Sequence, residues 1–423
     1  MPRGIRAPET SSAPGIRLVC VDDNDQRFAA CATLLVVFVI VIFGAFAAIQ
    51  LAARSVPEAS ASVVFPASSP LGEAKQPALP RDGASVVSVN GLGTIGSAGT
   101  TFPRSIASVT KMMTAYVILK SKPLQPGQTG PSIQITAADV ARWQQMIRED
   151  QSTVGVVAGQ PLTQLQLLQG LLVPSANNYA EILANWDAGS VEAFVQKMNA
   201  EAQALGMANT RYADPSGFHP GNTSTPQDQL LLARTAMQNP VFASIVGTQS
   251  LQLPGVGTVT NVNQLLGIDG VVGIKTGMTE EAGGNLAFAA RREVSGQSVE
   301  VVGVVLGQFD RPAAFTATRA ILQSLSANLQ VSRVISQGQA FASIETEWGE
   351  DVDIVVNEDI QALVWPGMTM ETNVELEDIS PGKRAGDQVG WLNVAVGEQA
   401  QRVPLVLAED LPEASLIWRL TRL

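Results

Sequence analysis

Ile106-Ala107-Ser108-Val109-Thr110-Lys111-Met112-Met113-Thr114-Ala115 is the stretch that decides the fold. It opens an apolar segment, Val109 to Leu119, that holds no helix breaker and is therefore predicted to be a largely buried helix. Ser108 falls in the first turn of this helix, and Lys111, three residues on, projects from the same face. A lysine desolvated in an apolar helix has a lowered pKa and can take the proton of a serine hydroxyl. The stretch therefore predicts a nucleophilic serine with a lysine base, and the free N–H groups of the helix start stabilise negative charge beside it.

The Ser-x-x-Lys spacing alone is weak evidence, because it arises about once or twice by chance in a chain of this length. A second copy is present, Ser380-Pro381-Gly382-Lys383. Its Pro-Gly pair makes a turn and cannot place the two side chains on a helix. The context of each copy therefore decides between them.

Composition limits the classes of protein that this chain can belong to. It has 423 residues, 46% hydrophobic and 15% charged, enough for two to three domains with proper cores. Its formal charge is −11, and the segment 331–423 carries 16 acidic and six basic residues, so nearly the whole excess lies there. No basic patch is visible, and we expect no nucleic-acid partner.

Cysteine and histidine are nearly absent. Both cysteines, Cys20 and Cys31, lie in the first 31 residues, so the rest of the chain can form no disulfide and bind no cysteine-ligated metal. His219 is the single histidine, which excludes a zinc site built on several histidines. A Ser-His-Asp triad would have to use His219, in the turn-rich run Asp214-Pro215-Ser216-Gly217-Phe218-His219-Pro220-Gly221, and lysine is the better base. No metal and no cofactor are expected.

The N-terminal part divides into a polar tail (1–27), an apolar span (28–50) and an Ala/Ser/Pro-rich linker (51–83). Phe28 to Ile49 has roughly the length needed to cross a bilayer as a helix. It exceeds the apolar core of about 7–15 residues typical of a signal peptide, so a membrane anchor is favoured, and cleavage near Ala45-Phe46-Ala47 is the alternative. The basic residues that flank the span place the tail in the cytoplasm and the rest of the chain outside it.

The remaining chain shows two patterns. The segment 84–330 mixes strands and helices: a hairpin at 84–89 and 94–98, helices at 137–146, 162–172, 178–186 and 191–205, strands near 270–273, 285–291 and 298–306, and a closing helix at 313–325. The segment 331–423 holds short strands with turn signals and predicts a small β-sandwich, with strands at 341–344, 352–356, 360–364, 372–376, 389–396 and 403–407. A helix at 414–423 is interpreted as a packing helix, with membrane contact as the alternative.

Two further short motifs follow Ser108 in order. Pro174-Ser175-Ala176-Asn177-Asn178 places a hydroxyl and a carboxamide between two helices, although Ser-x-Asn by itself is common. Gly273-Ile274-Lys275-Thr276-Gly277-Met278-Thr279 ends an apolar strand and occurs once. Its Lys and Thr can hold a carboxylate, and Gly277 lets the backbone approach a substrate closely. Ser-x-x-Lys, Ser-x-Asn and Lys-Thr-Gly in this order match the signature of penicillin-recognising serine enzymes.

On these motifs the chain resembles the serine-type D-alanyl-D-alanine carboxypeptidases, the low-molecular-mass penicillin-binding proteins, from about Ala84 to the C-terminus. The acidic C-terminal segment resembles the β-rich stalk domain of that family. The resemblance implies an α+β penicillin-recognising serine transferase fold, with a five-stranded antiparallel sheet between helices, a helical subdomain, and a small all-β C-terminal domain. The active site is then expected where the sheet meets the helical subdomain.

The resemblance also implies roles for individual residues. Ser108 is the acylated nucleophile and Lys111 its base. Ser175 relays a proton to the departing D-alanine, and Asn177 binds the amide carbonyl of the substrate and steadies Lys111. The backbone N–H groups of Ser108 and Met278 form the oxyanion hole. The implied substrate is the pentapeptide stem of peptidoglycan, and β-lactam antibiotics are the implied covalent inhibitors.

The end of the site that binds the terminal carboxylate departs from the family pattern. By the resemblance Lys275 supplies positive charge and Thr276 contacts the carboxylate. Close relatives add an arginine from the closing helix, and the position where it is expected holds Ala314. Arg311, three residues earlier, is the candidate replacement.

Two alternatives remain open from the sequence. A β-lactamase of the same fold needs a carboxylate to activate the deacylating water, after the second motif. Glu181, Asp187 and Glu192 follow that motif, without the loop pattern of the lactamase family. A non-catalytic wall-binding scaffold needs the linker and stalk alone, and the intact Ser108 and Lys111 argue against it.

Overall fold

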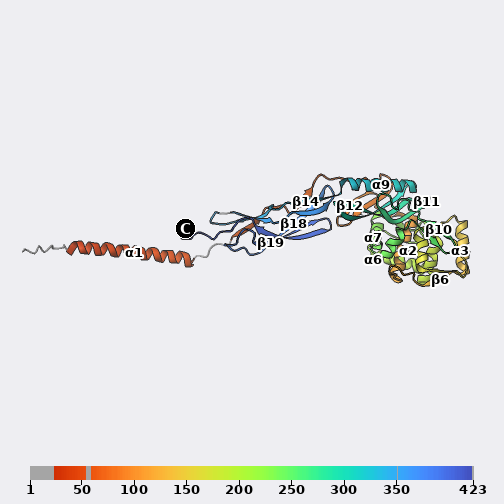
Figure 1. Cartoon of the computed structure of the whole chain (residues 1–423), viewed down its shortest axis with the longest axis horizontal. Coiled ribbons are helices and arrows are strands. Elements are labelled where there is room, and N and C mark those ends of the chain that lie inside the picture. The colour runs from red at the N-terminus through yellow and green to blue at the C-terminus, as the bar shows by residue number, and fades with distance from the viewer. Residues whose placement is uncertain (1–22, 54–58, 350, 422–423) are drawn as a thin grey trace, which may run out of the picture.

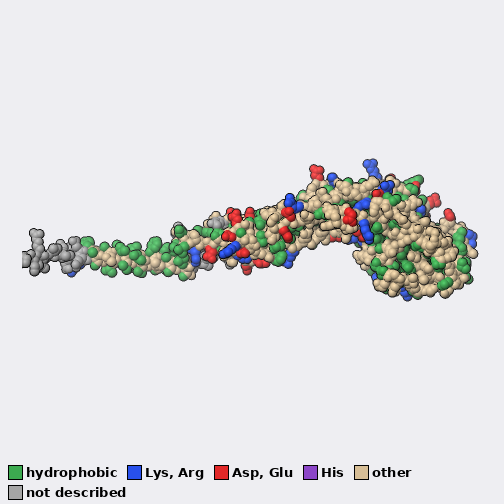
Figure 2. All heavy atoms as spheres, viewed as in Figure 1, with side chains coloured by type: hydrophobic (Ala, Val, Ile, Leu, Met, Phe, Trp, Pro, Cys, Tyr) green, Lys and Arg blue, Asp and Glu red, His purple; other side chains and the backbone are tan. Residues whose placement is uncertain are grey.

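The computed structural model describes residues 23–53, 59–349 and 351–421. An N-terminal helix, α1 (Asp23–Ala53), is followed by a β-rich domain and then by a mixed domain at the far end of an elongated molecule (Figure 1). Most of the predicted polar tail, including Cys20, lies outside the described residues. By length and composition the segment Arg27–Ala52 meets the requirements of a membrane span and equally those of a signal sequence. Figure 2 shows its apolar side chains exposed along the helix.

A five-stranded antiparallel sheet lies at the centre of the mixed domain, in the order β11-β12-β13-β3-β4. Both faces of this sheet are covered by packed layers, so its strands are rich in apolar residues. This is why the alternating and apolar runs of the sequence predict them. The predicted hairpin and later strands are found as β3 (Ala84–Val89), β4 (Gly93–Gly99), β11 (Val271–Thr279), β12 (Gly283–Val294) and β13 (Gln297–Gln308). The predicted antiparallel sheet is confirmed.

The two faces of this sheet bury different cores. On one face, Ala287 and Ala289 of β12 belong to a core shared with the helical subdomain. On the other face, Leu286 and Phe288 pack with the closing helix α9 (Arg311–Asn328). This alternation follows from the two-residue period of a strand. It fixes which side chains can reach the junction of sheet and helical subdomain.

The helical subdomain lies against the sheet on the side opposite α9 (Figure 1). It opens with a short 3-10 turn, η1 (Ala107–Thr110), that leads into the buried helix α2 (Lys111–Ser121). The predicted helix is found, but Ser108 lies in the 3-10 turn before it and not in its first α-helical turn. The other helices are α3 (Ala137–Arg148), α4 (Gln164–Leu172), α5 (Asn177–Ala188), α6 (Val191–Ala204), α7 (Pro226–Met237) and α8 (Pro240–Val246). Short strand pairs join them: β5 (Arg104–Ser105) with β8 (Thr223–Ser224), β6 (Ser132–Gln134) with β7 (Pro161–Thr163), and β9 (Ser250–Leu253) with β10 (Gly257–Thr260).

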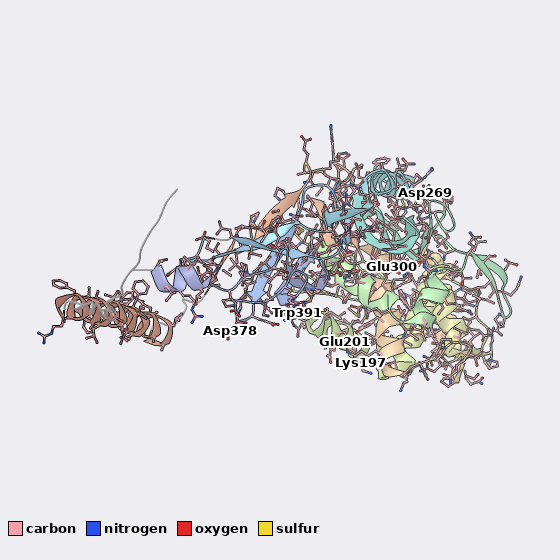
Figure 3. The ribbon with its side chains drawn as sticks, turned by 60° about the vertical axis from the view of Figure 1, so that its left-hand side comes forward. Lys197, Glu201, Asp269, Glu300, Asp378 and Trp391 are labelled. Atoms are coloured by element: carbon pink, nitrogen blue, oxygen red, sulfur yellow. The ribbon has the colours of Figure 1, made fainter. Side chains whose placement is uncertain are left out.

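The β-rich domain is built on a seven-stranded sheet with the order β1-β15-β16-β20-β19-β18-β2. Its strands are β15 (Ala340–Glu345), β16 (Val352–Val356), β18 (Met368–Leu376), β19 (Gln388–Val396) and β20 (Gln399–Leu407), with β14 (Gln330–Ile335) and β17 (Ile360–Val364) as a separate pair. Both groups of strands contribute to one core. In Figure 3 this domain, marked by Trp391 and Asp378, lies between α1 and the helical subdomain, marked by Lys197 and Glu201.

Part of the segment expected to be a linker is folded into this sheet. β1 (Ser60–Val63) pairs with β15 at one edge, and β2 (Ser68–Leu71) pairs with β18 at the other edge. Four residues connect the two strands, so the sheet must curl until its edges approach each other. The Ala/Ser/Pro composition suggested an extended linker, but edge pairing needs few apolar side chains and leaves little signal in the sequence.

The C-terminal helix α10 (Leu416–Thr421) differs from the expected packing helix. None of its residues is buried, and Leu416 and Ile417 are 61% and 74% exposed. Its neighbours include Trp348, whose ring lies 5.8 Å from that of Trp418. Leu416 and Ile417 therefore face outward, whereas Trp418 and Leu420 are half-buried, and α10 contacts α1 and not the core of the seven-stranded sheet.

The two domains are joined by direct contacts as well as by the chain. Arg234 of α7 donates two hydrogen bonds to the carboxylate of Glu398 in the β19–β20 turn, at 3.1 and 3.0 Å. The backbone N–H of Glu398 donates to the Gly91 carbonyl in the β3–β4 turn at 2.9 Å. The stalk-like domain therefore contacts the mixed domain at the end of the central hairpin.

Candidate active site

Ser108 lies in η1, where the chain is held between two close backbone approaches. A Cβ at Gly217 would lie 1.9 Å from the Ala107 carbonyl oxygen, and a Cβ at Gly277 would lie 3.0 Å from the Ser108 nitrogen. Ala107 itself adopts a φ of 46°, a conformation that is costly for a residue with a side chain. The surrounding loop and strand therefore hold the backbone of the serine in a conformation that an isolated helix would not adopt.

Lys111 is fully buried at the start of α2, and its amine has three neighbours. Nζ lies 2.8 Å from Ser108 Oγ, 2.6 Å from Asn177 Oδ1 and 2.6 Å from the Ser216 carbonyl oxygen. Burial lowers the pKa of Lys111 to about 7, and the nearby Asp214 carboxylate opposes this effect. The side chain is thus available as a neutral amine near physiological pH.

Ser175 and Asn177 come from the turn between α4 and α5. Ser175 is buried and has a φ of 68°, and Asn177 begins α5 with its carboxamide pointing at Lys111. The second motif of the sequence thus meets the first one across a helix-helix junction. The structure brings the hydroxyl of Ser108, the amine of Lys111 and the amide of Asn177 into one hydrogen-bonded group.

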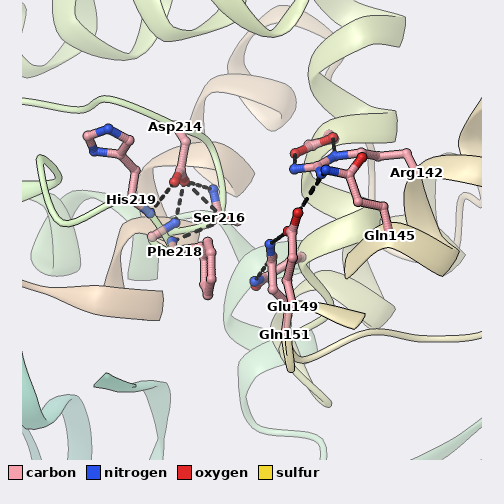
Figure 4. A network of polar contacts seen from close by, with 11 residues as sticks. Arg142, Gln145, Glu149, Gln151, Asp214, Ser216, Phe218 and His219 are labelled. Carbon is pink, nitrogen blue, oxygen red and sulfur yellow. Dashed lines mark hydrogen bonds and ion pairs between the residues drawn. The ribbon is translucent and has the colours of Figure 1, made fainter. Parts of the chain in front are cut away.

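The Asp214 loop supplies the third contact of Lys111. Oδ1 of Asp214 accepts from the backbone N–H groups of Ser216 and Gly217, both at 2.6 Å, and Oδ2 accepts from that of His219 at 2.5 Å (Figure 4). An aspartate that folds its own loop in this way is an Asx-type turn. The turn holds the Ser216 carbonyl toward the lysine.

β11 brings the third motif to the other side of Ser108. It is an edge strand of the central sheet, with β12 on one side. Its other side has no neighbouring strand and lies beside η1. Lys275 and Thr276 are buried there, whereas Met278 is 44% exposed. Nζ of Lys275 donates to the Thr276 carbonyl at 3.0 Å. Burial, together with the charges of Lys111 and Arg311, holds the pKa of Lys275 well below its ordinary value.

Arg311 and Ala314 face different surroundings, although both lie in the first turns of α9. Arg311 is half-buried, and its charge contributes to the lowered pKa of Lys275. Ala314 is fully buried in the apolar core between α9 and the sheet. Position 314, where an arginine was expected, therefore faces the core and not the site. Arg311 is the residue of α9 whose charge affects Lys275.

The residues of the alternative mechanisms have other partners. Glu181 accepts two hydrogen bonds from Arg142, both at 2.9 Å. Asp187 pairs with Lys197 at 2.8 Å. His219 is exposed, and its Nδ1 accepts from the backbone of Gly221 at 2.9 Å. These bonds are structural and link helices or close turns.

Two parts of the site are difficult to recognise from the sequence. The Ser216 carbonyl is a backbone group, and nothing in a side-chain pattern identifies it. Asp214 stands in a turn-rich run of the sequence, but its role in orienting the Ser216 carbonyl depends on loop geometry. The Asp-Pro-Ser-Gly composition is typical of an Asx-type turn and was the available hint.

Comparison with known proteins identifies the family of this chain. A family profile described as D-alanyl-D-alanine carboxypeptidase matches residues 75–310, more than half of the chain. A D-alanyl-D-alanine carboxypeptidase of Streptomyces sp. (strain K15) is 34% identical over 227 residues, which cover 50% of this chain and 75% of that protein. D-alanyl-D-alanine carboxypeptidase DacF of Bacillus subtilis (strain 168) is 25% identical over 75% of this chain and 82% of that protein.

Solved structures agree with this relationship. The crystal structure of the Streptomyces K15 DD-transpeptidase superposes with a TM-score of 0.52 at 30% identity, covering 60% of this chain and 100% of that chain. DacD from Francisella tularensis reaches a TM-score of 0.55 at 21% identity over 79% of this chain and 95% of that chain, and shows the shared fold. Fold and site together define a penicillin-recognising serine hydrolase. The chain belongs to the D-alanyl-D-alanine carboxypeptidase family, and it is a serine-type carboxypeptidase within that class.

Proposed function

We propose that this enzyme removes the terminal D-alanine from peptidoglycan pentapeptide stems through an acyl-enzyme on Ser108, from a membrane-anchored position outside the cytoplasm. The observation that carries the proposal is the arrangement around the Lys111 amine. Asn177 Oδ1 and the Ser216 carbonyl accept its two N–H bonds when it is neutral, both at 2.6 Å. Its lone pair is then left for the hydroxyl proton of Ser108, 2.8 Å away.

In the acylation step Ser108 Oγ attacks the carbonyl carbon of the penultimate D-alanine, and its proton passes to Lys111. The backbone N–H groups of Ser108 and Met278 stabilise the resulting oxyanion, and the close approach of Gly277 to the Ser108 nitrogen supports this pairing. Collapse of the intermediate breaks the C–N bond. Ser175 passes a proton to the leaving amine, and water then hydrolyses the Ser108 ester to release the shortened stem.

Recognition of the free carboxylate is proposed for Lys275, Thr276 and Arg311. Arginine remains charged at any working pH and supplies fixed positive charge. Burial and the charges of Lys111 and Arg311 depress the pKa of Lys275, and an arriving carboxylate favours its charged form. A free C-terminal carboxylate is what distinguishes a terminal D-alanine from an internal residue, so this cluster accounts for carboxypeptidase specificity. The same carboxylate is present in β-lactams, which we expect to acylate Ser108.

Penicillin labelling tests the proposal. We expect one covalent adduct, mapped to Ser108 by intact mass and peptide analysis, and none on Ser326 or Ser380. Ser326 makes a suitable comparison because its hydroxyl donates to the Leu322 carbonyl inside α9 at 3.0 Å. An adduct on another residue, or an unlabelled protein, contradicts the assignment. Ser108→Ala is the matched control and should remain unlabelled with an unchanged unfolding temperature.

A further inference from the structure

A chain of amide side chains leads from the catalytic lysine to the protein surface. Lys111 donates to Asn177 Oδ1 at 2.6 Å, and Asn177 Nδ2 donates to Gln151 Oε1 at 2.7 Å. Gln151 Nε2 in turn donates to Glu149 Oε2 at 2.7 Å, as Figure 4 shows. Every donor in this chain points toward the Glu149 carboxylate, so the amide dipoles are aligned head to tail.

The carboxylate at the end determines this direction. An ionised carboxylate only accepts hydrogen bonds, so the NH₂ group of Gln151 must face Glu149 and its oxygen must face Asn177. The NH₂ group of Asn177 must then face Gln151, and its oxygen is turned to Lys111. Without the Glu149 carboxylate the direction of the Gln151 amide is no longer fixed, and Asn177 is then oriented by Lys111 alone. A flipped Asn177 would present N–H to the lysine and remove one acceptor of its amine.

The backbone around Glu149 and Gln151 is rigidly closed. The Gln151 N–H donates to the Met146 carbonyl at 3.0 Å, the Asp150 N–H donates to the Ile147 carbonyl at 3.1 Å, and Asp150 has a φ of 53°. This is a Schellman-type ending of α3. The backbone carbonyl of the next residue, Ser152, accepts a hydrogen bond from the backbone N–H of Asn177 at 2.8 Å. The end of α3 is thus attached directly to the start of α5.

Side chains on α3 hold the carboxylate in place. Gln145 Nε2 donates to Glu149 Oε1 at 2.7 Å, and Arg142 lies 3.7 Å from Glu149 Oε2. Arg142 also makes its two bonds to Glu181, one helical turn after Asn177 on α5. Hydrogen bonds from Gln145 and Gln151, with the charges of Arg142 and Arg148, lower the pKa of Glu149, which keeps it ionised at neutral pH.

We propose that Gln151 and Glu149 are positioning residues for acylation: the Glu149 carboxylate orients the amides of Gln151 and Asn177, and the aligned chain sets the orientation and the proton affinity of Lys111. The inference rests on the proposed function, in which Lys111 is the base. Neither residue contacts Ser108 or the substrate carboxylate cluster. Aligned hydrogen bonds polarise one another, so a negative charge at the far end stabilises the protonated amine.

Among the charged groups near Lys111, Asp214 raises its pKa, and Lys275 has a pKa that reflects the charges of Lys111 and Arg311. None of these is part of the amide chain. Variants of Glu149 and Gln151 therefore change one contribution to the proton affinity of Lys111 and leave these three groups in place. The change is visible as a shift of the acid limb of the pH-rate profile.

The test is the second-order rate of Ser108 acylation by penicillin, measured across the pH range around 7 in the full-length protein. Gln151→Leu removes the acceptor of Asn177 and should slow acylation about 10- to 100-fold, since small displacements of a catalytic group cost rates of this order. Glu149→Gln should shift the acid limb to lower pH by roughly 0.5 unit, and Gln151→Glu should shift it to higher pH by a similar amount. Opposite shifts are not expected from a merely structural role.

Asp150→Asn is the matched control. It removes one negative charge between the two residues, and asparagine tolerates the left-handed conformation of Asp150. It should leave rate and acid limb unchanged. An equal shift in Asp150→Asn and Glu149→Gln would overturn the inference, because the effect would then be general electrostatics. Wild-type profiles in both Glu149→Gln and Gln151→Glu would overturn it too, even if Gln151→Leu folds poorly. Normal labelling of Ser108 in the wild type would in that case leave the proposed function intact.

Discussion

Arg311 lies close enough to Lys275 for its positive charge to lower the pKa of that lysine, although the two residues come from different elements, α9 and β11. Both side chains bring positive charge to one place, and no carboxylate is among the groups that set the pKa of Lys275. A carboxylate bound beside Lys275 and Arg311 would favour the charged form of the lysine. This pairing is the physical basis for expecting a substrate carboxylate at the Lys-Thr-Gly strand.

Arg311→Ala should raise KM for a D-Ala-D-Ala peptide roughly 10- to 100-fold. The reason is the loss of a charge-assisted hydrogen bond, worth about 1.5–3 kcal/mol when well placed. Steady-state kinetics on one defined peptide measure this effect. An unchanged kcat/KM in Arg311→Ala would show that Lys275 and Thr276 suffice.

Ala314→Arg is the matched comparison, and it should not improve binding. Ala314 is fully buried in the apolar core beneath α9, so a guanidinium there is desolvated and displaces packed side chains. We expect a loss of about 3 kcal/mol or more in the free energy of unfolding, measured by denaturant titration. A gain in affinity with unchanged stability would mean that α9 is rotated relative to this structure.

Acylation by penicillin should increase as pH rises through about 7, the pKa of Lys111, because the neutral amine is the base. Lys111→Arg should abolish this activity at all accessible pH values, since arginine keeps the charge but cannot lose its proton. Removal of a general base costs about 100- to 10,000-fold. Stopped-flow labelling of both proteins across the pH range is the measurement, and near-native rates in Lys111→Arg would exclude lysine as the base.

The penicilloyl-enzyme should hydrolyse slowly. A lactamase needs a carboxylate to activate the deacylating water, and Glu181 and Asp187 are held by Arg142 and Lys197. The persistence of the adduct over time, followed by intact mass, gives the rate. Rapid turnover of penicillin would favour the lactamase alternative.

A protein that starts at Ala84 should be less stable than one that starts at Ala59. The shorter chain lacks β1 and β2, which cover both edges of the seven-stranded sheet, and it loses the contact between the rings of Phe65 and Phe341 at 4.5 Å. Exposed edges also favour aggregation. We expect the unfolding temperature of the β-rich domain to fall by several degrees while penicillin labelling of Ser108 persists. Equal stability of the two proteins would show that β1 and β2 contribute little.

The sequence by itself determined the catalytic fold to a large extent. Ser108, Lys111 and the Lys275-Thr276-Gly277 run are short local patterns, and the strands and helices around them have clear apolar periodicity. Local patterns of this kind specify which elements form and in what order. They also identified the family, because three spaced motifs in order are far more specific than any one of them.

Tertiary structure decided the features that depend on contacts between segments far apart in the sequence. The edge positions of β1 and β2 arise from backbone pairing, which leaves little trace in side-chain patterns. The difference between Arg311 and Ala314 depends on the rotation of α9 on the sheet, which sequence spacing did not resolve. The Ser216 carbonyl and the Gln151–Glu149 chain reach Lys111 through loop closure and helix packing. Each of these is a contact between groups far apart along the chain, whose distance is set only when the cores on both faces of the sheet have closed.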